Sequence, residues 1–88
     1  MEIVKQHICD TYTNRGWDGS GCQFIFGEGW TVMVDTDDGK IRIGAYEHDS
    51  NDEYGDIPTI WIEIPEDREG VAISTVDAIV NSLPMTVA

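Results

Sequence analysis

Acidic side chains gather in two glycine-containing segments, and carboxylates are the ligands that calcium prefers. The first segment covers residues 35–39 and the second covers residues 49–55. An EF-hand loop needs glycine at its sixth position and a bidentate glutamate at its twelfth. Glycine is fifth in the first segment and seventh in the second. We therefore predict no dedicated metal site, and at most weak cation binding by these acidic turns.

Histidine and cysteine are too scattered to indicate a catalytic or zinc site. The sequence has two histidines, His7 and His48, and two cysteines, Cys9 and Cys22, without CxxC or CxxH spacing. The glycine-rich segment 16–21 lacks the GxGxxG fingerprint of dinucleotide-binding loops. No residue marks a nucleophile for a Ser-His-Asp or Cys-His arrangement. We expect both cysteines to be reduced and at least partly buried, and we predict a protein that is not an enzyme and binds no cofactor.

Negative charge is the strongest feature of the composition. The 88 residues contain 17 Asp and Glu against five Lys and Arg, so the formal net charge is −12. Twelve of the acids lie between Asp35 and Glu69, where three basic residues oppose them. This balance disfavours direct binding to nucleic acid or to anionic lipid, because both attract basic surfaces. It favours a basic protein partner, whose approach the negative field accelerates.

The hydrophobic pattern predicts a single α+β domain over residues 1–88, with four strands between two helices. A helix over residues 2–13 places Met1, Val4, Ile8 and Tyr12 on one stripe. The strands are expected at residues 22–26, 30–35, 40–47 and 57–64. A second helix over residues 75–83 follows Ser74, a favourable N-cap. We predict an antiparallel four-stranded β-meander with both helices packed on one face.

A common register for the two hairpins supports the meander. If Phe26 lies opposite Trp30, and Asp35 lies opposite Lys40, both hairpins place one apolar set on the same face. The predicted core face consists of Cys22, Phe24, Phe26, Trp30, Val32, Val34, Ile41, Ile43 and Ala45, extended by Ile60, Ile62 and Ile64.

The opposite face of the predicted sheet is less polar than most solvent-facing surfaces. It carries an apolar patch, made of Ile25, Met33, Tyr46 and Trp61. These side chains are either scattered surface hydrophobics, or covered by another segment, or a contact surface for a partner. An aromatic anchor with a charged rim is typical of protein-binding surfaces, and we adopt this interpretation.

We expect a non-enzymatic inhibitor that blocks a basic, nucleic-acid-binding surface of a partner protein. The predicted partner-binding residues are Asp35, Asp37, Asp38, Glu47, Asp49, Asp52, Glu53, Asp56, Met33, Tyr46 and Trp61. The carboxylates act as a nucleic-acid mimic, because they occupy sites that otherwise hold phosphates. In composition, the chain resembles phage-encoded inhibitors of bacterial defence systems, including anti-CRISPR and anti-restriction proteins.

Two other functions fit the same composition. An immunity protein that neutralises a basic nuclease toxin uses the same physics with a different partner. A dimeric structural or assembly subunit is the other alternative, because residues 70–88 are nearly uncharged and a homodimer through the C-terminal helix would bury them. The sequence shows neither a secretory signal nor an apolar run that spans a bilayer, so we expect a cytoplasmic protein.

Overall fold

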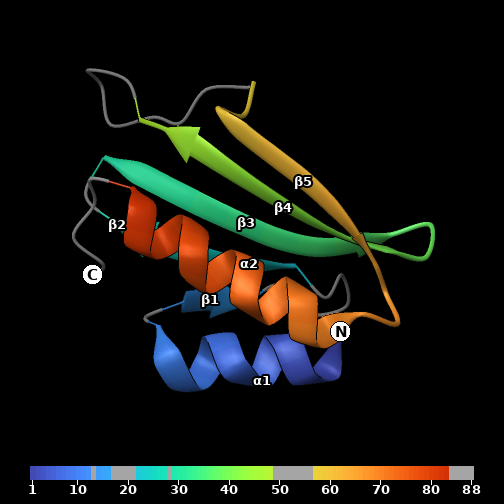
Figure 1. The fold of residues 1–88 in the computed structure, drawn as a ribbon. Coiled ribbons are helices and arrows are strands. Elements are labelled where there is room, and N and C mark those ends of the chain that lie inside the picture. The colour runs from blue at the N-terminus through green and yellow to red at the C-terminus, as the bar shows by residue number, and fades with distance from the viewer. Residues whose placement is uncertain (13, 17–21, 28, 49–56, 84–88) are drawn as a thin grey trace.

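The computed structural model describes residues 1–12, 14–16, 22–27, 29–48 and 57–83, and Figure 1 shows one sheet with two helices on one of its faces. The elements are α1 (Glu2–Thr11), β1 (Asn14–Gly16), β2 (Gln23–Gly27), β3 (Trp30–Asp37), β4 (Lys40–Glu47), β5 (Ile60–Pro65) and α2 (Glu69–Ser82). The strands lie in sequence order, and each is antiparallel to its neighbour. The predicted α+β meander between two helices is confirmed. Strand β1 is a short edge strand that the sequence analysis did not predict.

The hydrophobic core lies between the sheet and the two helices. Its buried apolar residues are Val4, Ile8, Ile25, Val32, Val34, Ile41, Ile43, Ala45, Ile64, Ala72, Val76, Ile79 and Val80. Met1 and Tyr12 pack against this cluster from the ends of α1. The predicted stripe of the first helix is therefore confirmed.

The hairpin between β2 and β3 corrects the predicted register by one residue. Gly27, and not Phe26, pairs with Trp30. Because side chains alternate between the faces of a strand, this step exchanges the two faces of β2. Ile25 is fully buried against the helices, whereas Phe24 is half-buried on the opposite face. The prediction that Cys22, Phe24 and Phe26 belong to the core face is wrong.

The length of the connecting loop explains this error. Pairing of Gly27 with Trp30 leaves two residues between the strands, and Gly29 has a φ of 84°. Two-residue hairpins favour such left-handed backbone, which glycine adopts without strain. The prediction counted Gly27 as part of a three-residue loop.

The hairpin between β3 and β4 differs from the prediction by two residues, because Lys40 pairs with Asp37 and not with Asp35. A shift of two residues keeps every side chain on its face. Val32 and Val34 are therefore buried as predicted. The turn consists of Asp38 and Gly39, which have φ values of 51° and 76° and match the Asp-Gly preference of tight hairpins.

Helix α2 begins at Glu69 and not after Ser74, so the predicted N-cap is wrong and Ser74 is an exposed residue within the helix. The Glu69 carboxylate accepts hydrogen bonds from the backbone N–H groups of Ile3 (2.9 Å) and Val4 (3.1 Å) in the first turn of α1. It also lies 2.9 Å from the α-amino group of Met1. These contacts hold the pKa of Glu69 below its usual value. One side chain thus joins the starts of both helices.

A polar cluster joins the two helices further along. The Asp77 carboxylate on α2 accepts a hydrogen bond from the Tyr12 hydroxyl at 2.5 Å and lies 2.9 Å from Nε2 of His7. Burial opposes ionisation of Asp77, but the contacts with Tyr12 and His7 outweigh it and lower the pKa of Asp77. Burial and the Asp77 contact raise the pKa of Tyr12. The ionised form of Asp77 therefore stabilises the packing of α1 against α2.

The register of β2 predicts a difference between two neighbouring substitutions. Ile25→Ala removes a fully buried side chain, so we expect it to lower the free energy of unfolding by about 2–5 kcal/mol. Phe24→Ala truncates a half-buried side chain on the opposite face and should cost less. Denaturant unfolding of both variants measures the difference. A larger cost for Phe24→Ala than for Ile25→Ala would contradict the register.

The Asp77 cluster predicts a pH dependence of stability. A carboxyl whose pKa is lowered by folding stabilises the protein above its unfolded pKa of about 4, and this contribution is lost as the pH falls through the folded pKa. We expect Asp77→Asn to be less stable than the parent at pH 7, with the gap closing below about pH 4. The exposed Asp67 offers a matched control, because Asp67→Asn removes the same charge. An equal pH profile for both variants would exclude the cluster as the cause.

Candidate protein-binding face

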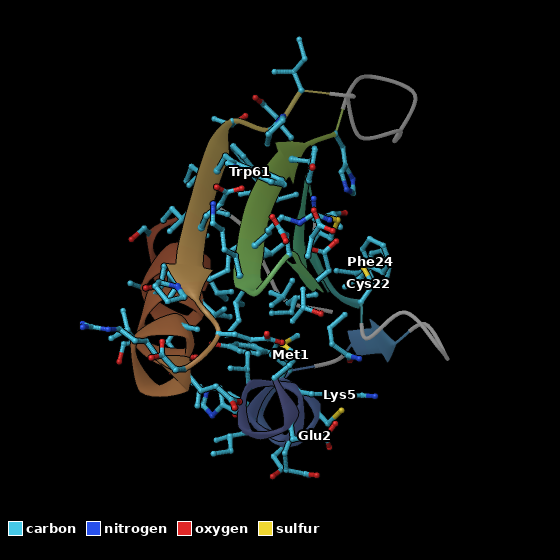
Figure 2. The ribbon with its side chains drawn as sticks, turned by 90° about the vertical axis from the view of Figure 1, so that its right-hand side faces the viewer. Met1, Glu2, Lys5, Cys22, Phe24 and Trp61 are labelled. Carbon is cyan, nitrogen blue, oxygen red and sulfur yellow. The ribbon has the colours of Figure 1, made fainter. Side chains whose placement is uncertain are left out.

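The sheet face opposite the helices, called the outer face below, carries most of the aromatic side chains of the sheet. Strand pairing arranges its centre in two rows, Phe24–Met33–Gly44–Trp61 and Phe26–Thr31–Tyr46. Figure 2 shows Phe24, Cys22 and Trp61 on the side of the sheet away from the helices. Met33, Tyr46 and Trp61 lie on this face, as the sequence predicted, whereas Ile25 lies in the core.

Trp61 is the most exposed aromatic side chain of the described residues, at 42%. Its ring lies over Gly44, because a Cβ at position 44 would be 3.1 Å from Cε3 and Cζ3 of Trp61. The same Cβ would be 3.0 Å from Cε2 of Tyr46. The Arg42 guanidinium lies 5.7 Å from the centroid of the indole, within the range of a cation–π contact. These contacts fix the position of the indole on the outer face.

Arg42 is itself fixed by two aspartates. Its Nε donates to Oδ1 of Asp35 at 2.8 Å, and its Nη2 donates to Oδ2 of Asp35 at 2.6 Å. A weaker bond of 3.4 Å joins Nη1 to Oδ2 of Asp37. The hydrogen bonds with Asp35 raise the pKa of Arg42 above its usual value, and the Asp35 side chain is only 14% exposed. Asp35 thus serves to hold Arg42 beside Trp61, and it offers less charge to a partner than Asp37.

Exposed carboxylates border the outer face at the β3–β4 hairpin. Asp37 and Asp38 are exposed there, and Glu63 of β5 lies 3.8 Å from Nζ of Lys40. Glu47 is also exposed, but it pairs with Trp30 and therefore lies at the opposite end of β4, on the helix side of the sheet. The structure thus brings together only part of the predicted acidic set. Four of the predicted contact residues lie outside the described residues: Asp49, Asp52, Glu53 and Asp56.

The cysteines and histidines of the described residues differ in burial and in their contacts. Cys22 is half-buried on the outer face, where burial and the nearby Asp35 raise the pKa of its thiol. A raised pKa disfavours the reactive thiolate. Cys9 is exposed on α1, so the expected partial burial is wrong for this residue. His48 Nε2 lies 2.6 Å from Oγ1 of the buried Thr31.

Among the described residues, no three His, Cys, Asp or Glu side chains gather in a way that could hold a metal ion. The sequence pattern predicts Gly44 on the outer face, but it does not predict Phe24 and Phe26 there or the contact of Gly44 with the rings of Trp61 and Tyr46. The pairing rule for a two-residue hairpin could have identified the two phenylalanines. The contact of two rings across Gly44 leaves no local signal in the sequence.

Comparisons with known proteins provide no relative. No family model, curated protein or solved structure matches the chain. Neither described helix is long and apolar enough to cross a membrane. The functional argument therefore depends on the geometry and charge of the outer face.

The gap at Gly44 predicts the effect of adding one methyl group. Gly44→Ala should displace the rings of Trp61 and Tyr46 and cost roughly 1–3 kcal/mol of stability, as overpacking does. Gly70→Ala is the matched control, because nothing lies within 4 Å of its Cβ. In a Trp61→Ala background the clash is partly relieved, so Gly44→Ala should cost less. Unfolding of the four combinations measures this coupling, and additive costs would contradict the contact.

Proposed function

We propose that this protein is a non-enzymatic acidic binding protein that covers a basic, nucleic-acid-binding surface of a partner protein. The observation that carries the proposal is the setting of Trp61. Its ring is exposed, rests on Gly44 and is held by Arg42, with the carboxylates of Asp37 and Glu63 on the same face. Aromatic anchors of this type dominate the binding energy of many protein interfaces. Because the ring is already positioned, binding loses little side-chain freedom.

The charge supports a basic partner and contributes at longer range. A net charge of −12 on a surface of 5281 Å² attracts cationic proteins and raises the rate of their encounter. Lysine and arginine side chains that bind phosphates form similar charge-assisted hydrogen bonds with carboxylates. Asp37 and Asp38 at the exposed hairpin are the described acids best placed for such contacts. The protein would then compete with nucleic acid for its partner.

The class of partner follows from this chemistry. A nuclease or a nucleic-acid-binding subunit of a defence complex presents a suitable basic surface, and the composition of the chain resembles that of phage-encoded anti-CRISPR and anti-restriction inhibitors. We therefore place the protein among inhibitors of the anti-defence type. A basic nuclease toxin presents the same surface chemistry, so an immunity protein would use the same contacts.

The test begins with a partner captured from host lysate at low salt and displaced by nucleic acid. Association and dissociation rates are then measured at two salt concentrations. Asp37→Lys combined with Asp38→Lys should slow association markedly at low salt, with a smaller effect at high salt. Glu2→Lys combined with Asp10→Lys is the matched control, because it makes the same charge change at exposed positions of α1. Equal effects of the two pairs would remove the hairpin from the interface.

The aromatic contribution has a separate readout. Trp61→Ala should raise the dissociation rate by at least about 30-fold, the equivalent of a 2 kcal/mol hot spot, with little dependence on salt. Ile3→Ala, at a residue of α1 that is more exposed than Trp61, should leave dissociation unchanged. An unchanged dissociation rate for Trp61→Ala would overturn the role of the outer face.

A further inference from the structure

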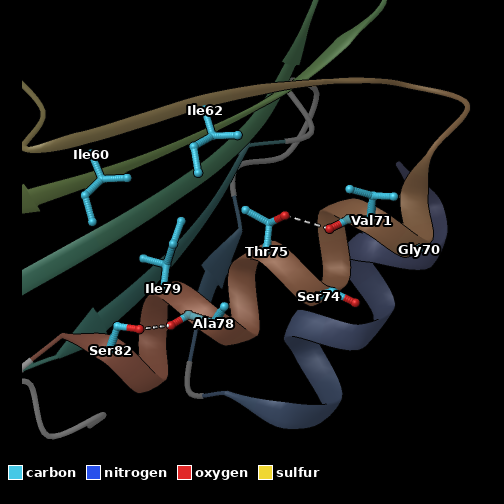
Figure 3. A pocket seen from close by; sticks show the side chains of 9 residues that line it. All are labelled: Ile60, Ile62, Gly70, Val71, Ser74, Thr75, Ala78, Ile79 and Ser82. Atoms are coloured by element: carbon cyan, nitrogen blue, oxygen red, sulfur yellow. Dashed lines mark hydrogen bonds between the residues drawn. The ribbon is translucent and has the colours of Figure 1, made fainter.

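A groove on the helix side of the molecule differs in character from the outer face. It runs between α2 and β5 and has a volume of about 750 Å³. Figure 3 shows Ile60 and Ile62 of β5 on one side and α2 on the other. The residues of α2 that line it are Gly70, Val71, Ser74, Thr75, Ala78, Ile79 and Ser82. Val71 is 50% exposed, so an apolar side chain stands open at this groove.

The groove is uncharged, although the chain carries a net charge of −12. None of its described lining residues is charged, and the one acid within the last three turns of α2, Asp77, points to α1. The hydroxyl of Thr75 donates to the Val71 carbonyl at 2.7 Å, and that of Ser82 donates to the Ala78 carbonyl at 2.6 Å. These hydroxyls are therefore satisfied within the helix. What α2 presents is an uncharged surface of small and aliphatic side chains, against which a second helix can pack.

Strand β5 forms the other wall and is an edge of the sheet. Among the described strands it pairs with β4 alone. An edge strand presents a row of N–H and C=O groups that a further strand can pair with. Natural proteins often block such edges with charged side chains, with bulges or with proline. In β5 such residues are confined to its second half, at Glu63 and Pro65.

We propose that β5 and α2 form the interface of a symmetric homodimer. The two β5 strands pair antiparallel, so that the two sheets join into one, and the two α2 helices lie side by side over the joint. A second copy is the occupant that fits, because it supplies an edge strand and an uncharged helix surface together. A basic partner would gain no ion pair in this groove. The contact is isologous, as in most dimers of identical chains.

The charges of β5 exclude a twofold axis at Glu63, which would place the two Glu63 carboxylates opposite each other, and the proposed axis lies at Ile62. A twofold axis at Ile62 places Ile60 opposite Ile64 and Trp61 opposite Glu63 of the second copy. The two Glu63 carboxylates then do not face each other directly, which avoids a destabilising like-charge pair. The isoleucines of both strands lie under the two α2 helices. The outer faces of the two copies stay open, so the dimer is independent of the proposed contact with a basic protein.

The dependence on salt concentration distinguishes the proposed homodimer from the proposed complex with a basic partner. Two copies at −12 repel each other, so added salt should strengthen the dimer. Salt should weaken a complex between the outer face and a basic partner. The first measurement is analytical ultracentrifugation over a concentration series at low and high salt. We expect a species with the mass of two chains, and we expect the fraction of protein in this dimer to increase with protein concentration and with salt. A monomer under all of these conditions would overturn the proposal.

Substitutions at the groove test the place of the interface. Ser74→Arg combined with Ala78→Arg introduces two charges at exposed positions, and we expect at least tenfold weaker dimerisation. Gln6→Arg combined with Thr11→Arg makes the same charge change at exposed positions of α1 and is the matched control. Circular dichroism checks that both variants are folded. Equal weakening by the two pairs would exclude the groove.

Disulfide trapping tests the register. In a Cys9→Ser and Cys22→Ser background, Ile62→Cys places two thiols at the twofold axis, where paired Cα atoms are about 4.5–5.5 Å apart. This distance lies within the range of a disulfide. Oxidation should give covalent dimers of Ile62→Cys, but not of Glu2→Cys on α1. If both variants form dimers equally, or if neither does, the pairing of two β5 strands about Ile62 is excluded.

Discussion

Gly27 lies opposite Trp30 in the hairpin between β2 and β3, and this pairing assigns every side chain of β2 to a face of the sheet. Because strand side chains alternate, Ile25 reaches the helices and Phe24 reaches the outer face. The core between the sheet and α1 is thus filled by a compact aliphatic side chain. Both the packing of the core and the aromatic character of the outer face depend on one two-residue connection.

Elements with a single local signal could be predicted from the sequence, whereas elements with two competing signals could not. The alternation of Ile41, Ile43 and Ala45 leaves one choice of face, and this choice is confirmed. In β2 both alternating sets contain apolar residues, so only the loop length decides between them. Ser74 is locally a good N-cap, but α2 begins at Glu69. The Glu69 carboxylate binds the N–H groups of Ile3 and Val4, and no local pattern reveals these contacts. The position of Trp61 was predictable, but its contact with Gly44 depends on pairing across strands.

The charge of the molecule is distributed so that its two apolar surfaces respond differently to their surroundings. The outer face has carboxylates at its border and an arginine, Arg42, that Asp35 holds beside Trp61. The surface of α2 beside β5 has no charge among its lining residues. Coulombic attraction therefore favours a cationic molecule at the outer face. At the surface of α2 beside β5, repulsion opposes a second negatively charged molecule, and dissolved salt weakens this repulsion.

The contact of Glu69 with the first turn of α1 has a consequence for synthesis on the ribosome. The residue that carries the N–H group, Val4, is translated 65 residues before Glu69, whose carboxylate accepts its hydrogen bond. An isolated helix of ten residues is only marginally stable in water. In the nascent chain, α1 is therefore unstable until α2 has been made. The hydrogen bonds of the first turn of α1 are therefore completed only by Glu69, at the start of α2. A product truncated before Glu69 would leave the apolar face of the sheet uncovered by α2 and would be a ready substrate for proteases.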